Sequence, residues 1–484
     1  MAPSPTGEFH IGGMRTLLYN YALAKKEHGR FVLRIEDTDR ERFVEGAAER
    51  LLQVIKDYGL SWDEGPVIGG PHAPYIQSER LELYRKHARL LVKEGYAYYC
   101  FCSKERLDAL REEQKAHGLA ATRYDKHCLS LSKEEVDRRL TAKIPYVIRF
   151  NVPPDGKISF EDKILGTVSF PTNDIDDAVL LKSDGYPTYH LAVVIDDHLM
   201  GINFVMRGVE WLPSTPKHIL LYNAYKWEIP VYAHLPVLKE KNATQKLSKR
   251  TGSVAAPEFL AEGYLPEALL NFLMFLGWNP GTEKELYTLD EFVAEFSLDR
   301  VHKTDLIAFD RQKLLWMNGI YIRNLSDEIF YERVKYFVEK YGSDLNFDDF
   351  EKDHVLHALS LVKERAKTLK EVLSLIRYFF FAPAISKEAV ASFAKTSARV
   401  EEILSSFEAL FEPISEDAWS KESLDLAARS LLTKRGYSAR EAFMTLRVAT
   451  TGEATTPPIF DVLALLGRKD TLERISNARL LIYH

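Results

Sequence analysis

Pro3-Ser4-Pro5-Thr6-Gly7-Glu8-Phe9-His10-Ile11-Gly12-Gly13 is the stretch around which the rest of the chain is organised. Its prolines favour an extended entry, and its glycines permit close approach of the backbone. Apolar residues follow at helical spacing, which predicts that Gly12 and Gly13 lie near a helix N-terminus: Leu17, Leu18, Tyr21 and Ala22. Free N–H groups and the helix dipole favour an anion there. The stretch therefore predicts a phosphate site.

Strand and helix patterns alternate after this turn. Phe31–Ile35 has the bulky apolar residues of a short buried strand, and a helix is expected from Ala47 to Tyr58. This order is typical of a doubly wound α/β domain, in which ligands bind at the carboxyl ends of the strands. Glu36 would lie at such an end. It is either a solvated loop carboxylate or an anchor for a cationic ligand group such as an amine.

Length, composition and charge describe an ordinary globular protein. The chain has 484 residues, 46% of them hydrophobic and 28% charged, and about 150 residues per domain suggests about three or four domains. No apolar run is near the length of about 20 residues that spans a bilayer, and no cationic leader opens the chain. A cytoplasmic protein without a membrane partner is expected. The net charge of −6 means that local basic patches would have to bind any nucleic acid.

Three cysteines lie in one short segment that resembles an insertion between two halves of the sheet. Their odd number argues against a disulfide framework and toward a metal site. Cys100 and Cys102, followed by Tyr124 and Cys128, bring together three thiols and a phenol, with His127 as an alternative fourth group. Zn²⁺ takes four ligands in a tetrahedron, although a tyrosine oxygen is an unusual one. Three free cysteines in a reducing cell are the competing interpretation.

After the insertion, Leu191–Ile195 is again an apolar run of the kind found in α/β domains, and it is expected to be a strand. Asp196-Asp197-His198 follows it. Because neighbouring residues on a strand point to opposite faces, a structural or turn role is favoured over a metal site. A further strand, Phe204–Met206, delivers Arg207 to its carboxyl end. An arginine at that position can bind a ligand carboxylate with two parallel hydrogen bonds. The alternative interpretation of Arg207 is an ion pair on the protein surface.

Lys246-Leu247-Ser248-Lys249-Arg250 is a basic stretch in an expected loop. It can clamp a polyphosphate, whereas most basic pentamers are solvated loops. From about Asp310 onward, amphipathic helical patterns replace the strands, which predicts an all-helical region of two packed bundles. Arg365 and Arg447 lie in this region and, on pattern alone, are plain charges on a helix face.

The two signature stretches together resemble the HIGH-type and KMSKS-type motifs of class I aminoacyl-tRNA synthetases. Either motif is weak alone, but the pair in this order, separated by an α/β sheet with an insertion, is specific. The sequence around these motifs resembles that of glutamyl-tRNA synthetases of bacterial or organellar type. The residues that carry the resemblance are His10–Gly13, Lys246–Arg250, Ala2–Gly7, Arg34–Asp39, Asp184–Tyr189 and Asp196–Gly201.

The resemblance implies a fold and a division into domains. The fold class is α/β, a Rossmann-type doubly wound parallel sheet with an α+β insertion, followed by all-helical C-terminal anticodon-binding domains. The expected boundaries are 1–98 for the first half of the catalytic domain, 99–187 for the acceptor-stem-binding insertion with the zinc site, 188–240 for the second catalytic half, 241–312 for a stem-contact region, and 313–376 and 377–484 for two helical anticodon-binding domains.

The implied reaction has two steps. Glutamate attacks the α-phosphate of ATP to give glutamyl-adenylate, and the glutamyl group then passes to the 2′-OH of the terminal tRNA adenosine. His10, Lys246 and Lys249 are the implied catalytic residues, acting by positioning and charge stabilisation. The implied ATP-binding residues are His10, Gly12, Gly13, Glu210, Leu238, Lys246, Leu247, Ser248 and Lys249. The implied glutamate-binding residues are Ala2, Ser4, Glu36, Tyr189, Arg207 and Trp211.

The resemblance also implies partners and cofactors. The helical region would read unstacked anticodon bases of tRNA-Glu, with Arg365 and Arg447 as contacts, and tRNA-Gln stays open as a second substrate. ATP would carry Mg²⁺. Zinc binding occurs in some relatives, and Ser130 stands where those with a final Cys-x-His have the histidine. The implied metal ligands are therefore Cys100, Cys102, Tyr124 and Cys128. A monomer is expected.

Two departures keep alternative functions open. Val193 stands where some relatives have asparagine, and the arginine that usually stands two residues before Ala2 is absent, because only Met1 precedes it. The missing arginine would pair with the glutamate side chain, so a catalytically impaired RNA-binding paralogue is one alternative. Glutaminyl-tRNA synthetase is the other, although the helical C-terminal half lacks the strand alternation of that relative's β-barrel anticodon module.

Overall fold

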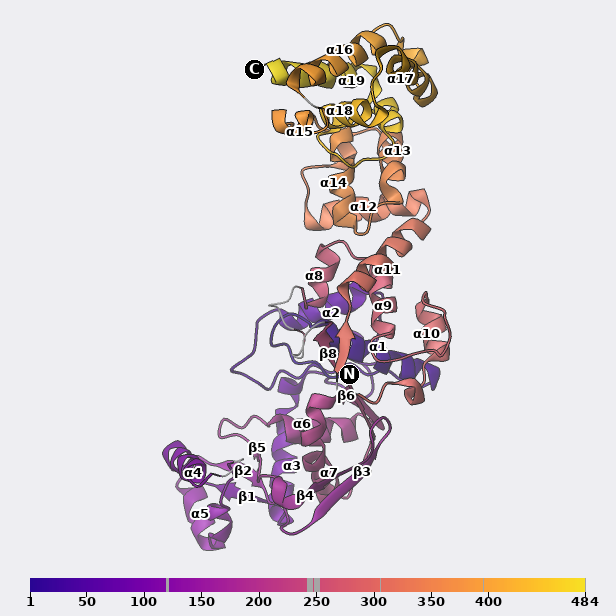
Figure 1. The fold of residues 1–484 in the computed structure, drawn as a ribbon. Helices are drawn as coiled ribbons and strands as arrows, with labels where there is room; N and C mark the ends of the chain where they lie inside the picture. Colours follow the sequence, from indigo (N-terminus) through magenta and orange to yellow (C-terminus); the bar gives the residue numbers. More distant parts are fainter. Residues whose placement is uncertain (119–121, 242–246, 248–252, 305, 395, 484) are drawn as a thin grey trace. The chain divides into compact units, whose positions relative to one another are not determined.

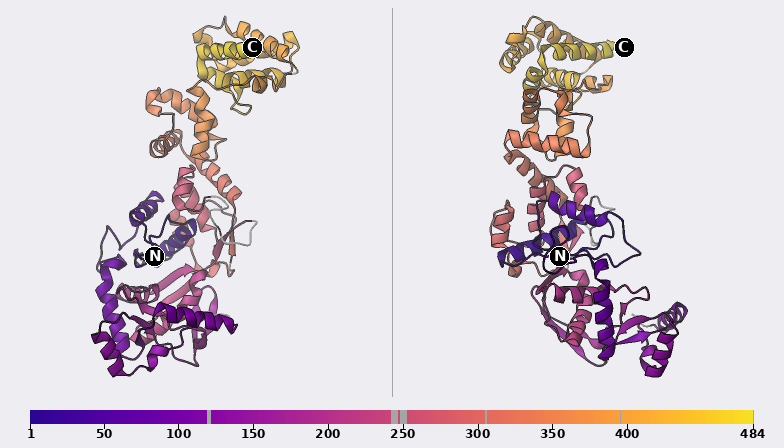
Figure 2. Two further views of the ribbon diagram at one scale, coloured as in Figure 1. Left: turned by 90° about the vertical axis from the view of Figure 1, so that its left-hand side faces the viewer. Right: turned by 180° about the vertical axis from the view of Figure 1, so that it is seen from behind.

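The computed structural model describes residues 1–118, 122–241, 247, 253–304, 306–394 and 396–483. The chain forms two compact units (Figures 1 and 2). The first unit comprises Met1–Glu258 and Leu270–Asp310, and the second comprises Phe259–Leu269 and Arg311–His484. This division into two units is coarser than the six segments expected from the sequence, so the boundaries of those segments stay predictions.

The predicted N-terminal helix is confirmed as α1 (Ile11–Lys26), with His10 as its N-cap. Its buried face consists of Ile11, Met14, Leu17, Leu18, Tyr19 and Ala22. Gly13 must be glycine for packing, since a Cβ there would lie 2.7 Å from the Phe9 ring. Lys25 and Lys26 end the helix, where cations stabilise the dipole.

The main sheet has the strand order β4-β3-β7-β6. Strands β6 (Phe204–Gly208) and β7 (Val231–Leu235) are parallel and pair Arg207 with His234. Strand β3 (Lys157–Asp162) is parallel to β7 and antiparallel to β4 (Gly166–Pro171). The sheet thus joins strands from segments predicted as the insertion and as the second catalytic half.

Two smaller sheets complete the strands of the first unit. An antiparallel sheet consists of β1 (Ala97–Cys100), β2 (Val147–Phe150) and β5 (Val179–Leu181). Helices α4 (Lys104–Ala116) and α5 (Lys133–Thr141) lie beside it in Figure 1 and in the right-hand view of Figure 2. A parallel pair consists of β8 (Val237–Glu240) and β9 (Leu306–Phe309).

Several helices of the first unit pack against its sheets, among them α1 against β6. The predicted helix near residues 47–58 is confirmed as α2. The first unit also contains α2 (Ala47–Asp57), α3 (Leu81–Lys93), α4 (Lys104–Ala116), α5 (Lys133–Thr141), α6 (Tyr189–Leu199), α7 (Thr215–Tyr225) and α10 (Leu289–Glu295), and the residues of α8 (Ala256–Ala261) and α9 (Pro266–Met274) are divided between the two units.

Two predicted strands are wrong. Phe31–Ile35 is buried but makes only single bridges, Val32 with Glu64 and Ile35 with Ile76. Leu191–Ile195 lies in α6 instead of in a strand. A continuous apolar run is compatible with a buried strand and with a buried helix, and here every residue of the run is buried.

The second unit is helical throughout, as predicted. After β9 its described residues contain helices and no strand: α11 (Arg311–Asn324), α12 (Asp327–Tyr341), α13 (Lys352–Lys363), α14 (Leu369–Ile376), α15 (Lys387–Ala391), α16 (Ser397–Phe411), α17 (Lys421–Arg435), α18 (Ala439–Thr451) and α19 (Ile459–Tyr483). Helix α19 is interrupted at Gly467, where φ is +81°.

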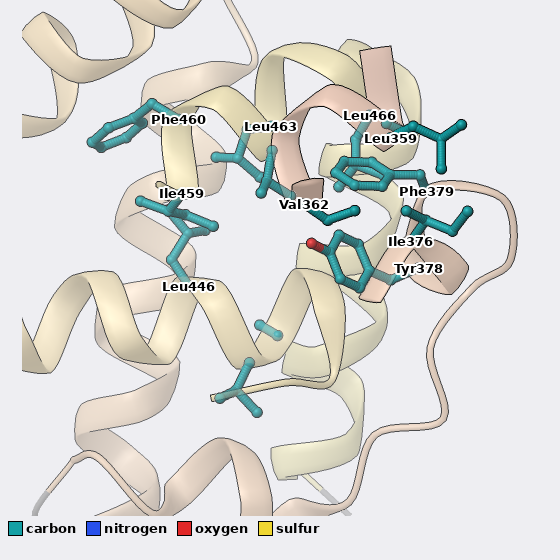
Figure 3. Close-up of a cluster of buried hydrophobic side chains, with 14 of the residues drawn as sticks. Leu359, Val362, Ile376, Tyr378, Phe379, Leu446, Ile459, Phe460, Leu463 and Leu466 are labelled. Carbon is teal, nitrogen blue, oxygen red and sulfur yellow. The ribbon is translucent and has the colours of Figure 1, made fainter. Parts of the chain in front are cut away.

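One hydrophobic cluster holds the second unit together. Figure 3 shows Leu359 and Val362 of α13 beside residues of α14, α18 and α19, among them Ile376, Leu446 and Leu463. Full burial of each such side chain contributes about 1.5–3 kcal/mol. The cluster contains residues from both predicted helical domains, so they share one core.

Candidate active site

A cavity of about 620 Å³ opens in the first unit. Residues from the N-terminal stretch, α1, α6, β6 and β8 line it. It includes all the sequence-predicted ATP and glutamate residues that the structure describes, except Leu247: Ala2, Ser4, His10, Gly12, Gly13, Glu36, Tyr189, Arg207, Glu210, Trp211 and Leu238. Segments more than 200 residues apart in the sequence therefore meet around one cavity.

The start of α1 forms one end of this cavity. His10 Nδ1 accepts a hydrogen bond from the Gly12 backbone N–H at 3.0 Å. Because Nδ1 is the acceptor, the neutral imidazole carries its proton on Nε2, where it is a donor. The helix dipole adds partial positive charge at the same place. A donor and a helix N-terminus on one wall suit a phosphate group.

The predicted basic loop lies mostly outside the described residues. Lys246, Ser248 and Lys249 belong to that part. Leu247 is described: it is buried, and its backbone N–H donates to the Leu238 carbonyl at 2.9 Å. Leu238 lines the cavity, so Leu247 lies beside a residue of the cavity wall.

Arg207 is held by neutral groups. Its Nε donates to His234 Nε2 at 3.2 Å, and its Nη2 donates to the Thr215 hydroxyl at 2.8 Å. Its Nη1 lies 3.1 Å from the Tyr189 hydroxyl and 3.4 Å from His218 Nδ1. Burial lowers the pKa of both histidines, so they are neutral acceptors. Among the described residues no carboxylate pairs with this guanidinium, and its charge is available to a ligand carboxylate.

Glu36 belongs to a buried network of ion pairs. Its carboxylate accepts from Arg34 at 3.0 Å, and Arg34 also pairs with Asp197 at 2.9 Å and with Asp196 at 3.6 Å. Burial raises the pKa of Glu36 to about 7; Arg34 opposes this rise, and the two aspartates add to it. Glu36 is therefore a buried carboxylate of the cavity wall, and the solvated-loop alternative is wrong. A ligand ammonium group beside it would favour its ionised form.

The predicted structural role of the two aspartates is confirmed, on a helix instead of a strand or turn. Asp196 is fully buried in α6 and accepts from Arg80 at 2.8 Å, Gln77 at 2.9 Å and Tyr84 at 2.8 Å. All these donors come from residues 77–84. The carboxylate thereby ties α6 to the first turn of α3 and to the 3-10 turn that precedes it.

Aromatic side chains form part of the cavity wall. The rings of Tyr189 and Trp211 lie 4.7 Å apart, and Trp211 is 43% exposed. Burial raises the pKa of Tyr189 to about 12, so its phenol stays protonated. Since the phenol oxygen accepts from Arg207, its own O–H is left to donate. Val193, also in the wall, is buried and apolar.

The four predicted metal ligands meet in space. The sulfur atoms of Cys100, Cys102 and Cys128 all lie within 4.8 Å of one another. The Tyr124 hydroxyl lies 3.4 Å from Cys100 Sγ and 3.2 Å from Cys102 Sγ. Sulfur ligands around a tetrahedral Zn²⁺ lie about 3.8 Å apart, so the group fits this ion.

The protonation of these groups bears on metal binding. A hydrogen bond from Cys128 lowers the pKa of Cys100 to about 4, which favours the thiolate that metals need. Burial and the neighbouring thiols raise the pKa of Tyr124, so the phenol is neutral unless a cation binds. His127, the alternative fourth ligand, does not belong to the cluster formed by the described His, Cys, Asp and Glu side chains.

The two predicted anticodon residues lie close enough in the second unit to influence each other. Arg365 is exposed just after α13. Arg447 in α18 is half-buried, and its Nη1 donates to the carbonyl and hydroxyl of Thr456 at 2.9 and 2.8 Å. Burial lowers the pKa of Arg447, and the nearby charge of Arg365 lowers it further. Arginines from two different helical segments thus gather in one region.

The sequence interpretation missed the groups that support two of the predicted site residues. His234 and Asp162 support Arg207, and Arg34 supports Glu36. Arg34 stands two residues before Glu36 in an apolar run, and this buried charge was a signal that could have been used. His234 and Asp162 carried no such signal, because their contact depends on the pairing of β3 with β7.

The described residues include no helix that is both long enough and apolar enough to span a membrane.

Comparisons with known proteins cover nearly the whole chain. Residues 1–316 match the family described as tRNA synthetases class I (E and Q), catalytic domain, and residues 329–479 match the family described as anticodon binding domain. The chain is 42% identical over 481 residues to the glutamate–tRNA ligase of Clostridium kluyveri and 43% identical over 476 residues to that of Clostridium novyi. Each alignment covers 98% of this chain and 96% of the relative.

Solved structures show the same likeness. A glutamate tRNA ligase from Elizabethkingia meningosepticum, crystallised in complex with its amino acid, is 36% identical with a TM-score of 0.86. The glutamate-tRNA synthetase of Elizabethkingia anophelis is 36% identical with a TM-score of 0.84. Both comparisons cover 99% of this chain and 98% of the other. They confirm the predicted fold class.

Proposed function

The chain belongs to the class I tRNA synthetases of the E and Q family, and from this we propose that it ligates L-glutamate to tRNA-Glu at the expense of ATP. The reaction forms glutamyl-adenylate and pyrophosphate, and then esterifies the 2′-OH of the terminal adenosine. AMP is released in the second step. The named relatives support glutamate over glutamine as the amino acid.

The observation that carries this proposal is the charge arrangement of the cavity. Arg207, whose hydrogen-bond acceptors among the described residues are neutral, lines the same cavity as Glu36, a carboxylate. An amino acid carries both a carboxylate and an ammonium group, so the two side chains offer a partner of opposite charge to each. Tyr189 supplies a further donor beside Arg207. Ala2, Ser4 and Trp211 complete the proposed glutamate pocket.

The proposed ATP site lies at the α1 end of the cavity. His10 Nε2–H and the start of α1 at Gly12 and Gly13 would bind phosphate oxygens. Lys246 and Lys249 would stabilise charge on the leaving pyrophosphate, a role that rests on the family resemblance. ATP would enter with Mg²⁺, which neutralises phosphate charge. Glu210, Leu238, Leu247 and Ser248 are the remaining proposed ATP contacts.

No protein nucleophile is needed for this chemistry. The glutamate carboxylate attacks the α-phosphorus, and the bond to the bridging oxygen of pyrophosphate breaks. The chain holds both reactants in line and compensates the growing negative charge, which is catalysis by positioning and electrostatics. A cavity that offers a hydrogen-bond donor and a helix N-terminus on one wall suits this role.

The proposed partners outside the cavity are tRNA and zinc. Arg365 and Arg447 would contact anticodon bases of tRNA-Glu, and the charging assay below decides whether tRNA-Gln is a second substrate. Cys100, Cys102, Tyr124 and Cys128 would hold one Zn²⁺, which would supply structural support to the insertion. The proposed assembly is a monomer and the proposed compartment is the cytoplasm.

Aminoacylation with radiolabelled amino acid tests the proposal. Purified protein receives ATP, Mg²⁺ and either glutamate or glutamine, with tRNA-Glu or tRNA-Gln. We expect acid-precipitable label with glutamate and tRNA-Glu, and pyrophosphate exchange with glutamate when tRNA is present. A second form of the protein carries an N-terminal extension that restores the arginine expected from the family, and it is assayed in parallel. Absence of glutamate charging in both forms would refute the proposal, and charging with glutamine would favour the alternative.

A further inference from the structure

The side chain of Arg207 has a second layer of support that no part of the proposed chemistry requires. We propose that Asp162 and His234 form a positioning pair, which sets the tautomer of His234 and thereby holds Arg207 ready for the glutamate carboxylate. This inference rests on the proposed function, since it concerns the glutamate pocket. Neither Asp162 nor His234 lines the cavity.

Three neighbouring strands bring the groups together. Asp162 ends β3, His234 lies in β7, and Arg207 lies in β6, with β7 between the other two. The Asp162 and His234 side chains are fully buried. His234 Nδ1 lies 2.6 Å from Asp162 Oδ2, and its Nε2 lies 3.2 Å from Arg207 Nε. The imidazole therefore bridges the carboxylate and the guanidinium.

The hydrogen bonds of Asp162 decide which imidazole nitrogen carries the proton. Its Oδ1 accepts backbone N–H groups of Ile164, Leu165 and His234, at 3.0, 2.9 and 3.3 Å. Its Oδ2 is the partner of His234 Nδ1. An ionised carboxylate only accepts, so Nδ1 carries the proton and Nε2 presents a lone pair to Arg207. Burial lowers the pKa of His234, whereas the hydrogen bond that the ring donates to Asp162 raises it; the net lowering agrees with a neutral ring.

The hydrogen bonds of Thr215 agree with the same tautomer of His234. Its hydroxyl accepts from Arg207 Nη2 at 2.8 Å and lies 3.2 Å from His234 Nε2. The hydroxyl proton is then directed to the Nε2 lone pair. With Nε2 protonated instead, the ring N–H would face both the Arg207 Nε–H and this hydroxyl. The local network is satisfied by one tautomer.

The imidazole also keeps the charge of Arg207 available. A carboxylate in direct contact with the guanidinium would compete with a ligand carboxylate for it. Here the buried anion, Asp162, fixes the orientation of Arg207 through a neutral ring, and the guanidinium stays free of an anionic partner among the described residues. The arrangement thus fixes geometry without neutralising the binding group.

Asp162→Asn is the decisive substitution, because it preserves shape and reverses the tautomer. The amide oxygen keeps accepting the three backbone N–H groups, so the NH₂ group faces His234 Nδ1. Nδ1 must then accept, and the ring proton moves to Nε2, facing Arg207. We expect the KM for glutamate and the calorimetric Kd for glutamate to rise about 10- to 100-fold. The KM for ATP and kcat at saturating glutamate should change little.

Two His234 variants separate positioning from loss of structure. His234→Gln places an acceptor oxygen near the former Nε2 and has no tautomer to reverse, so we expect glutamate affinity within a few-fold of the unmodified protein. His234→Asn keeps a donor for Asp162 but has no atom near Nε2, so its KM for glutamate should rise as in D162N. In the double variant D162N/H234Q, the Asp162 substitution should have no further effect on glutamate binding.

Asp177→Asn is the matched control. Asp177 is also buried and accepts from Tyr98 at 2.6 Å and from the Val152 N–H at 3.1 Å, with no contact to Arg207. The glutamate affinity of the D177N variant should equal that of the unmodified protein. The inference would be overturned if D162N bound glutamate as tightly as D177N. It would also be overturned if Asp162→Asn weakened glutamate binding as much in the H234Q variant as in the unmodified protein. If the unmodified protein did not bind glutamate, the proposed function itself would fail.

Discussion

Glutamate binding should depend on pH through Glu36. This carboxyl is 6% exposed, and burial raises its pKa to about 7 despite the opposing effect of Arg34. An exposed glutamate titrates near pH 4.3, so it is ionised throughout the range from pH 6 to pH 8. Because the proposed partner of Glu36 is the ammonium group of the ligand, only the ionised form binds. Affinity should therefore increase as pH rises.

The size of the effect follows from the ionised fraction. With a pKa of about 7, about one tenth of Glu36 is ionised at pH 6 and about nine tenths at pH 8. The apparent Kd equals the intrinsic Kd divided by this fraction. The Kd for glutamate should thus be about eight to ten times weaker at pH 6 than at pH 8. The α-ammonium group of the ligand stays protonated across this range and adds no slope.

Isothermal titration calorimetry with L-glutamate at pH 6, 7 and 8 and constant ionic strength measures this dependence. Glu36→Gln should bind more weakly and with the same Kd at all three values. Glu8→Gln is the matched control, since Glu8 also lines the cavity but is exposed and pairs with Arg50, so the slope should persist. A Kd that is constant from pH 6 to pH 8, or a slope that survives in E36Q, would refute the reasoning.

Three further substitutions address the rest of the chain. Arg34→Met should lower the stability of the first unit by about 3–5 kcal/mol, because three buried carboxylates lose their cation, and a calorimetric melt without such a loss would contradict the network. Cys102→Ser should lower the zinc content measured by atomic emission and the melting temperature, whereas zinc-free unmodified protein would exclude the metal site. Arg365→Gln should raise the KM for tRNA-Glu several-fold and leave the KM for ATP unchanged, and an unchanged tRNA KM would argue against anticodon contact.

Local patterns in the sequence were sufficient for several parts of this structure. The start of α1 at Ile11, the strand that carries Arg207, and the all-helical second unit depend on residues close together in the chain. Helix periodicity and turn residues act over a few residues, so these elements follow from the sequence itself. The close spacing of Cys100 and Cys102 likewise indicated a metal site before any contact was known.

Long-range contacts decided the remaining features. Leu191–Ile195 is helical because that conformation buries the run on all sides and carries Asp196 and Asp197 to Arg34, which lies about 160 residues earlier in the chain. The pKa of Glu36 depends on the same network.

The sequence by itself determined which short motif is the candidate for a phosphate site, because that motif is contiguous. Only the tertiary structure decided how the residues of the site are supported. His234 lies between Asp162 and Arg207 through the register of β3, β7 and β6, and the sequence contains no local signal for a pairing of strands that are so far apart in the chain. The physical reason is that burial and strand register, which set the charge and tautomer of these groups, are properties of the folded chain.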